Sequence, residues 1–183
     1  QTHFVDGGYL SYEEFKAQTP KFTDSLTIRK RTMSDIKAWG GNDYKAESMS
    51  EKLSKKVIKN QIWGICKNDT LYLNGLNLTG LIWFARVEIY GNYCFLKPSF
   101  PANKAIQKEL GLHEPENLAF MFGMVGGAIA GAEMAVKRIP LILDLKTDTK
   151  MVLSKENICK LLDEYTDLKS EFEAENLYSQ EYC

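Results

Sequence analysis

Residues 118–136 read LAFMFGMVGGAIAGAEMAV, and the expected fold of the chain is organised around this stretch. Small residues recur in it at every fourth position: Ala119, Gly123, Gly127, Gly131 and Ala135. Residues four apart lie nearly above one another on a helix, so these five would form a stripe without bulky side chains. Each interior glycine costs a helix roughly 1 kcal/mol relative to alanine, and close packing of another backbone can offset that cost. The stretch therefore predicts a glycine-zipper helix that contacts another element, or a partner, through Gly123, Gly127 and Gly131.

Three environments are considered for this helix. Its uncharged part ends before Glu133 and is about 22 Å long at the helical rise per residue, which is short of the roughly 30 Å hydrocarbon core of a bilayer. No transmembrane span is therefore expected. A buried helix whose stripe lies against a sheet or another helix is favoured. A glycine-rich segment that moves onto a partner or a lipid surface stays open as an alternative.

The rest of the chain is rich in strand patterns. Alternating or β-branched apolar residues predict strands over residues 25–32, 44–47, 57–66, 70–74, 81–90, 93–96, 141–146 and 151–153. Capping residues predict helices over residues 11–18 and 103–110, and a further helical region from Ser154. The predicted fold class is α+β, a mostly antiparallel sheet of about five to eight strands or a small barrel-like meander with packed helices. Since no linker or repeat interrupts the chain, a single domain over residues 1–183 is expected.

The turn at residues 39–43, WGGND, is the first candidate ligand site. Trp39 provides an aromatic ring, and two carboxylates, Asp35 and Asp43, flank it. A sugar or a cation could be bound by these groups together with Asn42. The alternative is that Asn42 and Asp43 only supply hydrogen bonds within the turn.

The strand predicted at residues 81–90 carries the second candidate surface. Phe84, Arg86, Glu88 and Tyr90 alternate with an apolar face that includes Ile89. Arg86 and Glu88 are therefore candidate ligand-binding residues. The alternative is that these two side chains pair on a solvated face or lie beneath a helix.

Charge and motifs exclude several function classes. The chain has 23 basic and 24 acidic residues, a net charge of −1 and a pI of about 6.2, so neither nucleic acid nor an anionic membrane is an expected partner. The basic clusters at residues 29–31 and 55–56 are interpreted as solvated faces. Because no catalytic or metal-binding motif occurs, no catalytic residue, metal site or cofactor is predicted. Cys66 and Cys94 lie in apolar strand patterns and are expected to be buried free thiols.

Three segments carry a resemblance to a known family: IKAWGGNDYK at residues 36–45, KRIPLILDLKT at 137–147 and LSKENICKLLDEY at 153–165. Together they are similar to an uncharacterised family of exported proteins from Bacteroides-type bacteria. The resemblance implies an upstream signal peptide and a periplasmic or cell-surface location. It transfers no catalytic residue.

These features favour a non-enzymatic exported protein, a binding or envelope-associated module. Its expected partner is another protein, a glycan or an envelope component. The enzyme alternative is a hydrolase acting on a glycan or a peptide through surface carboxylates, which would need two carboxylates about 5–10 Å apart. A third alternative is membrane interaction through the glycine-striped residues 118–136.

Overall fold

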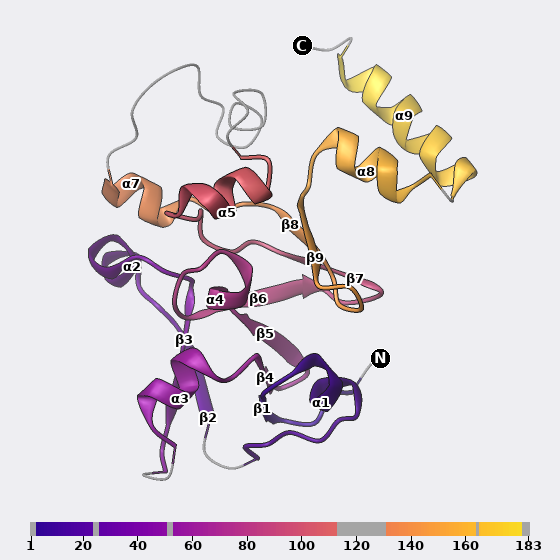
Figure 1. Cartoon of the computed structure of the whole chain (residues 1–183). Helices are drawn as coiled ribbons and strands as arrows, with labels where there is room; N and C mark the ends of the chain where they lie inside the picture. The colour runs from indigo at the N-terminus through magenta and orange to yellow at the C-terminus, as the bar shows by residue number, and fades with distance from the viewer. Residues whose placement is uncertain (1–2, 24–25, 51–52, 113–130, 164, 181–183) are drawn as a thin grey trace.

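The computed structural model of the chain describes residues 3–23, 26–50, 53–112, 131–163 and 165–180. The strands in these residues form one antiparallel sheet with the order β1-β4-β5-β6-β7-β8-β9, and the β2–β3 pair joins it where β3 pairs with β6 (Figure 1). The strands are β1 (Gly7–Tyr9), β2 (Leu26–Lys30), β3 (Tyr44–Ser48), β4 (Gly64–Lys67), β5 (Thr70–Asn74), β6 (Phe84–Ile89), β7 (Tyr93–Leu96), β8 (Leu141–Asp144) and β9 (Thr149–Val152).

Helices of 4 to 15 residues accompany this sheet. The described residues contain α1 (Tyr12–Lys16), α2 (Met33–Trp39), α3 (Lys55–Asn60), α4 (Gly75–Leu78), α5 (Lys104–Glu109), α7 (Gly131–Val136), α8 (Lys155–Leu161) and α9 (Thr166–Gln180). The α+β prediction is therefore confirmed. The barrel-like alternative is not, because in the described part of the chain the end strands β1 and β9 pair only with β4 and β8, so the sheet stays open.

Alternation along the central strands divides the core into two clusters, one on each face of the sheet. On β4, Ile65 belongs to the smaller cluster and Cys66 to the larger one. On β6, Phe84 belongs to the smaller cluster and Ala85 to the larger one. Successive residues of a strand point to opposite faces, so each central strand contributes to both clusters. The smaller cluster supports β2, β3 and α3.

Two predictions between residues 32 and 66 are wrong. No helix was predicted at α2, and residues 57–66, predicted as one strand, divide into the end of α3 and strand β4. The sequence carries a signal for α2 that was overlooked, since Thr32 and Asp35 form a capping box at its first turn.

The helix α3 is held at both of its ends. The Ser54 hydroxyl caps the first turn. At the other end, the side chain of Asn74 donates to the carbonyl oxygens of Lys59 at 2.8 Å and Ile62 at 2.7 Å. Carbonyls at a helix end have no partner within the helix, so Asn74 stabilises a helix end that the sequence alone does not reveal.

Most of the glycine-striped stretch, including Gly123 and Gly127, lies outside the described residues. Its described end is the helix α7, which begins at Gly131 and packs against α2. None of the helices in the described ranges combines the length and the apolar character that crossing a bilayer requires. The end of the stretch is thus attached to the helix that carries Trp39.

Candidate functional site

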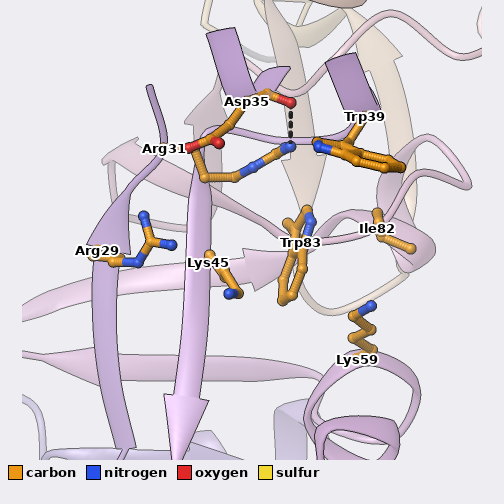
Figure 2. A pocket seen from close by; sticks show the side chains of 8 residues that line it. All are labelled: Arg29, Arg31, Asp35, Trp39, Lys45, Lys59, Ile82 and Trp83. Carbon is orange, nitrogen blue, oxygen red and sulfur yellow. Dashed lines mark hydrogen bonds between the residues drawn. The ribbon is translucent and has the colours of Figure 1, made fainter. Parts of the chain in front are cut away.

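A cavity of about 290 Å³ opens between β2, β3, α2, α3 and the turn before β6 (Figure 2). It is lined by Arg29, Arg31, Asp35, Trp39, Lys45, Lys59, Ile82 and Trp83. Four of these residues are basic, two are tryptophans and one is acidic. We call this cavity the basic pocket.

The register of β2 and β3 sets one side of the basic pocket. Arg29 lies directly opposite Lys45, while Leu26 and Ala46, an odd number of positions away along their strands, are buried in the smaller core cluster. Because successive residues of a strand point to opposite faces, burial of the apolar pair turns the two basic side chains to the same outer face. Like charges at opposed positions destabilise a sheet. The Glu47 carboxylate, which pairs with Lys45, offsets part of this repulsion, and a bound anion would relieve more of it.

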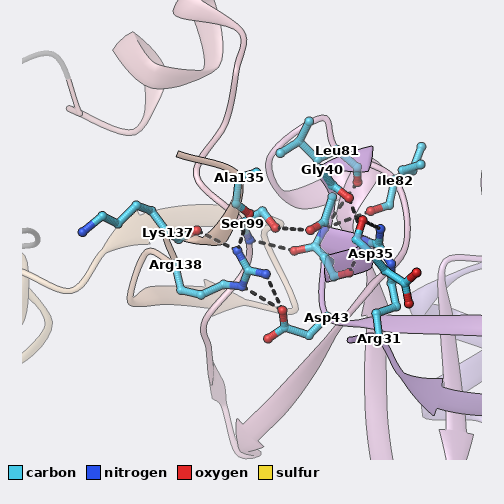
Figure 3. Close-up of polar contacts among 12 residues, drawn as sticks. Arg31, Asp35, Gly40, Asp43, Leu81, Ile82, Ser99, Ala135, Lys137 and Arg138 are labelled. Carbon is cyan, nitrogen blue, oxygen red and sulfur yellow. Dashed lines mark hydrogen bonds and ion pairs between the residues drawn. The ribbon is translucent and has the colours of Figure 1, made fainter. Parts of the chain in front are cut away.

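Arg31 supplies a buried positive charge to the pocket. Its side chain is 6% exposed, and its guanidinium donates to the backbone carbonyls of Gly40 at 2.7 Å, Asn42 at 2.9 Å and Asp35 at 2.9 Å (Figures 2 and 3). Burial lowers the pKa of Arg31 from its ordinary value, but an arginine keeps its charge in proteins. Neutral carbonyls orient the guanidinium, and the nearby carboxylates of Asp35 and Asp43 favour its charged form.

Trp83 forms a buried wall of the pocket with a strained backbone. It is 9% exposed and has a φ of 73°, a left-handed conformation that bulky residues seldom adopt. The Nζ atoms of Lys59 and Lys45 lie 4.6 Å and 5.5 Å from the centroid of its ring. Cation–π attraction at these distances holds both ammonium groups at the pocket. Backbone strain of this kind tends to collect at functional sites.

Trp39 is, with Asp35, one of the two sequence-predicted residues that line the pocket. It is the last residue of α2, and Gly40 ends the helix in a left-handed conformation with its N–H donated to the carbonyl of Ile36. The indole of Trp39 is 79% exposed, and Figure 2 shows the guanidinium of Arg31 extending toward it. Trp39 therefore offers accessible aromatic surface beside a concentrated positive charge.

Asp35 is the one carboxylate among the described residues that line the pocket. Hydrogen bonds with Thr32 lower its pKa, and they occupy it in capping α2. A second carboxylate, that of Glu47, pairs with Lys45 from outside the lining. Four basic side chains against one carboxylate still leave the lining with a formal excess of three positive charges, in a chain whose net charge is −1.

Asn42, also predicted to bind a ligand, is instead a fully buried structural link. Its Nδ2 donates to the carbonyls of Leu81 and Ile82, both at 3.4 Å, and its Oδ1 accepts from the backbone N–H of Ser99 at 2.7 Å (Figure 3). A Cβ atom added to Gly75 would lie only 1.8 Å from this Nδ2. Packing this close leaves no room for a ligand at Asn42.

Asp43 is likewise engaged within the protein. Its carboxylate accepts from Nε of Arg138 at 3.0 Å and also from Nη2 (Figure 3). Nη1 of Arg138 donates to the carbonyls of Ala135 at 3.0 Å and Lys137 at 2.8 Å. The ion pair connects the turn at residues 39–43 to the end of α7, so Asp43 has a structural role.

Arg86 and Glu88 lie apart from the basic pocket. Both are exposed on β6, at a separate cavity of about 160 Å³, and Glu88 pairs with Lys97 at 3.2 Å. Ile89, predicted on the apolar face of this strand, is 63% exposed, and the β6–β7 register shifts between Val87 and Ile89. The structure therefore brings neither candidate together with Trp39.

Sequence reasoning missed Arg29, Arg31, Lys45, Lys59 and Trp83. The interpretation of residues 29–31 as a solvated face is wrong for the buried Arg31. Alternation along β2 was the one available signal, because it separates Arg29 from Lys30. No sequence signal places Lys59 or Trp83 beside them, since these residues come from distant segments.

Metal and thiol chemistry have little basis in the described residues. No group of three His, Cys, Asp or Glu side chains among them could hold a metal ion. Cys66 and Cys94 are buried free thiols, as predicted. Burial raises the pKa of Cys66 to about 12 and that of Cys94 to about 11, so both remain unreactive thiols at neutral pH.

Comparison with known proteins places the chain in a family. Residues 7–183 match a family of unknown function, DUF6563. No curated protein and no solved structure gives a significant match. The family match spans every element that forms the basic pocket. The chain therefore belongs to the family of unknown function DUF6563.

Proposed function

We propose that the chain is a non-enzymatic binding module that takes an anionic ligand into the basic pocket. The observation that carries the proposal is the convergence of four basic side chains on one cavity in a chain of net charge −1. Mutual repulsion of Arg29 and Lys45, and burial of the Arg31 charge, both raise the energy of the empty pocket. An anion would relieve both effects, which is the arrangement expected of a binding site.

Binding is favoured over hydrolysis by the positions of the carboxylates. Asp43 is held by Arg138, and Glu88 pairs with Lys97. Only Asp35 remains at the pocket among the described lining residues. A hydrolase of the glycosidase type would need two carboxylates about 5–10 Å apart across its substrate.

The proposed setting is the periplasm or the cell surface. The resemblance of residues 36–45, 137–147 and 153–165 to exported proteins of Bacteroides-type bacteria supports it. There the anionic group would be carried by a glycan, an envelope component or a protein. Fractionation of the source cells tests this setting: recovery in the periplasm or on the surface is expected, and recovery in the cytosol contradicts it.

A titration with inorganic sulfate and inorganic phosphate at low ionic strength tests the binding itself. NMR chemical shifts should report one site, and Arg29→Gln should weaken binding about tenfold by removing a charged contact. Lys30→Gln is the matched control, because Lys30 is the next residue of β2, is exposed and does not line the pocket. The proposal fails if neither anion binds, or if both variants lose affinity equally.

A further inference from the structure

The two tryptophans of the basic pocket differ in the surface they leave free. Trp83 is buried, and the ammonium groups of Lys59 and Lys45 lie over its ring. Its indole therefore positions charges. Trp39 is 79% exposed at the rim, so most of its indole surface is accessible. A flat ring of a ligand can stack there, as bases do on aromatic side chains.

Arg31 retains hydrogen-bonding capacity after its described contacts are counted. A guanidinium has five N–H donors, and the described bonds use both hydrogens of Nη1 and one of Nη2. Nε–H and the second hydrogen of Nη2 are left. A guanidinium donates bonds of this kind to the oxygens of a phosphate or a carboxylate.

The other basic groups approach the cavity from separate elements. Arg29 lies on β2 and Lys59 on α3. A carboxylate offers two oxygens in one plane, whereas a phosphate or sulfate ester offers three oxygens arranged as a tripod. Side chains from β2, α3 and the residue that follows β2 line the cavity from different elements, and such a set of donors suits three oxygens better than two in one plane.

The volume of the cavity limits the ligand. About 290 Å³ lies at the lower end of the range of small-molecule sites. This volume suits one ring with its charged substituent. It is small for an extended polymer segment.

From these observations we infer that the ligand of the basic pocket is a small ring-bearing phosphate or sulfate ester. Its ring stacks on Trp39, and its ester oxygens contact Arg29, Arg31 and Lys59. The inference rests on the proposed function and adds the chemical class of the ligand. It also assigns Trp39 to the ring and the basic residues to the ester.

Calorimetric titrations of the whole chain at low ionic strength test this assignment. The probes are inorganic phosphate, inorganic sulfate, glucose, glucuronate, glucose 6-phosphate, glucose 6-sulfate and adenosine 5′-monophosphate. At least one ester should bind roughly tenfold more tightly than the inorganic ions, a gain typical of stacking. Glucuronate, which has a carboxylate on the same kind of ring, should bind at least several-fold more weakly than glucose 6-sulfate, and glucose should not bind measurably.

Two variants test the contribution of the ligand's ring to affinity separately from that of its ester group. Trp39→Ala should reduce the affinity for the ester to about that for the inorganic ion, a much larger loss than the same variant shows for the ion. Met33→Ala is the control, because Met33 is an exposed apolar residue of the same helix that does not line the pocket. Neither change should alter the melting temperature by more than about 2 °C, since surface substitutions have small effects.

The possible results distinguish this inference from the proposed function. If neither the inorganic ions nor the esters bind, the proposed function fails and the inference fails with it. If the ions bind but no ester binds more tightly, or Trp39→Ala has no effect, only the inference is overturned. Equal affinity for glucuronate and glucose 6-sulfate also overturns it. Tighter binding of the sugar esters or of the nucleotide than of the inorganic ions supports the inference in both cases. Which of the two binds more tightly shows whether a sugar ring or a base stacks on Trp39.

Discussion

The two sides of the turn at residues 39–43 differ in where their side chains lie and in what those side chains contact. On one side, Trp39 is exposed at the rim of the basic pocket. On the other, Asn42 is buried with its amide bonded to three backbone groups, and Asp43 is paired with Arg138. Arg31 lies between the two sides and donates to the carbonyls of Gly40 and Asn42.

Whether a polar side chain is free to bind a ligand depends on its partners within the protein and not on its residue type. Asn42 and Asp43 are bonded to partners within the protein, so they stabilise the fold. The basic groups of the pocket face one another with one lining carboxylate among the described residues, so they gain most from an external anion. Substitutions on the two sides should therefore change stability and binding in different ways.

The largest expected change in stability is at Asn42, on the side of the turn whose side chains are bonded within the protein. Asn42→Ala should lower the free energy of unfolding by about 3 kcal/mol, because it leaves the buried N–H of Ser99 and two carbonyls without their partner. Urea denaturation followed by circular dichroism measures the change. A loss below about 1 kcal/mol would show that Asn42 is not a structural link.

The ion pair beside it should have a smaller effect. Arg138→Gln should lower the free energy of unfolding by about 2 kcal/mol, since it removes the charged partner of the half-buried Asp43. The same urea experiment applies, with the exposed Lys104→Gln as a control for the charge change. Equal free energies of unfolding for the two variants would contradict the structural role of Arg138.

In the basic pocket, a substitution should have the opposite effect on the free energy of unfolding. Arg29→Gln should leave the free energy of unfolding unchanged or raise it by up to about 0.5 kcal/mol, because it removes the repulsion from Lys45. The same variant should weaken anion binding about tenfold. Urea denaturation with and without sulfate measures both quantities. A clear loss of stability without sulfate would mean that Arg29 is structural and would end the contrast between the two sides.

The smallest expected effect is that of pH on sulfate binding. Hydrogen bonds with Thr32 lower the pKa of Asp35. Its carboxylate is therefore ionised at neutral pH and repels an anion. Protonation removes this repulsion, and sulfate affinity should therefore rise only when the pH falls below the ordinary carboxyl pKa of about 4. Between pH 6 and 8 a calorimetric titration should give a constant affinity for sulfate. A steep change within that range would point to another titrating group at the site.

Local patterns predicted much of the fold. Ser11 accepts from the N–H of Glu14 at the start of α1, and Ser154 from that of Asn157 at the start of α8, as the capping signals indicated. The hairpins β4–β5, β6–β7 and β8–β9 also lie where alternation and turn residues placed them, apart from the start of β4. These elements were predictable because their stabilising contacts lie within a few residues along the chain.

Errors occurred where a distant contact decided the outcome. The β-branched residues near 57–62 suited a strand as well as a helix, and the capping of the end of α3 by Asn74 favours the helix. Of the candidate site, the sequence predicted Trp39 and Asp35. Its basic residues looked like ordinary surface charges, since nothing near them in the sequence indicated a shared cavity.

By itself, the sequence determined the α+β composition, most strands and helix caps, and the near-zero net charge, because each depends on neighbouring residues or on composition. The tertiary structure alone decided which charges converge. The β2–β3 register places Arg29 beside Lys45, and packing of α3 and the turn before β6 adds Lys59 and Trp83. Electrostatic and stacking energies depend on distances in space, and chain pairing between remote segments sets those distances.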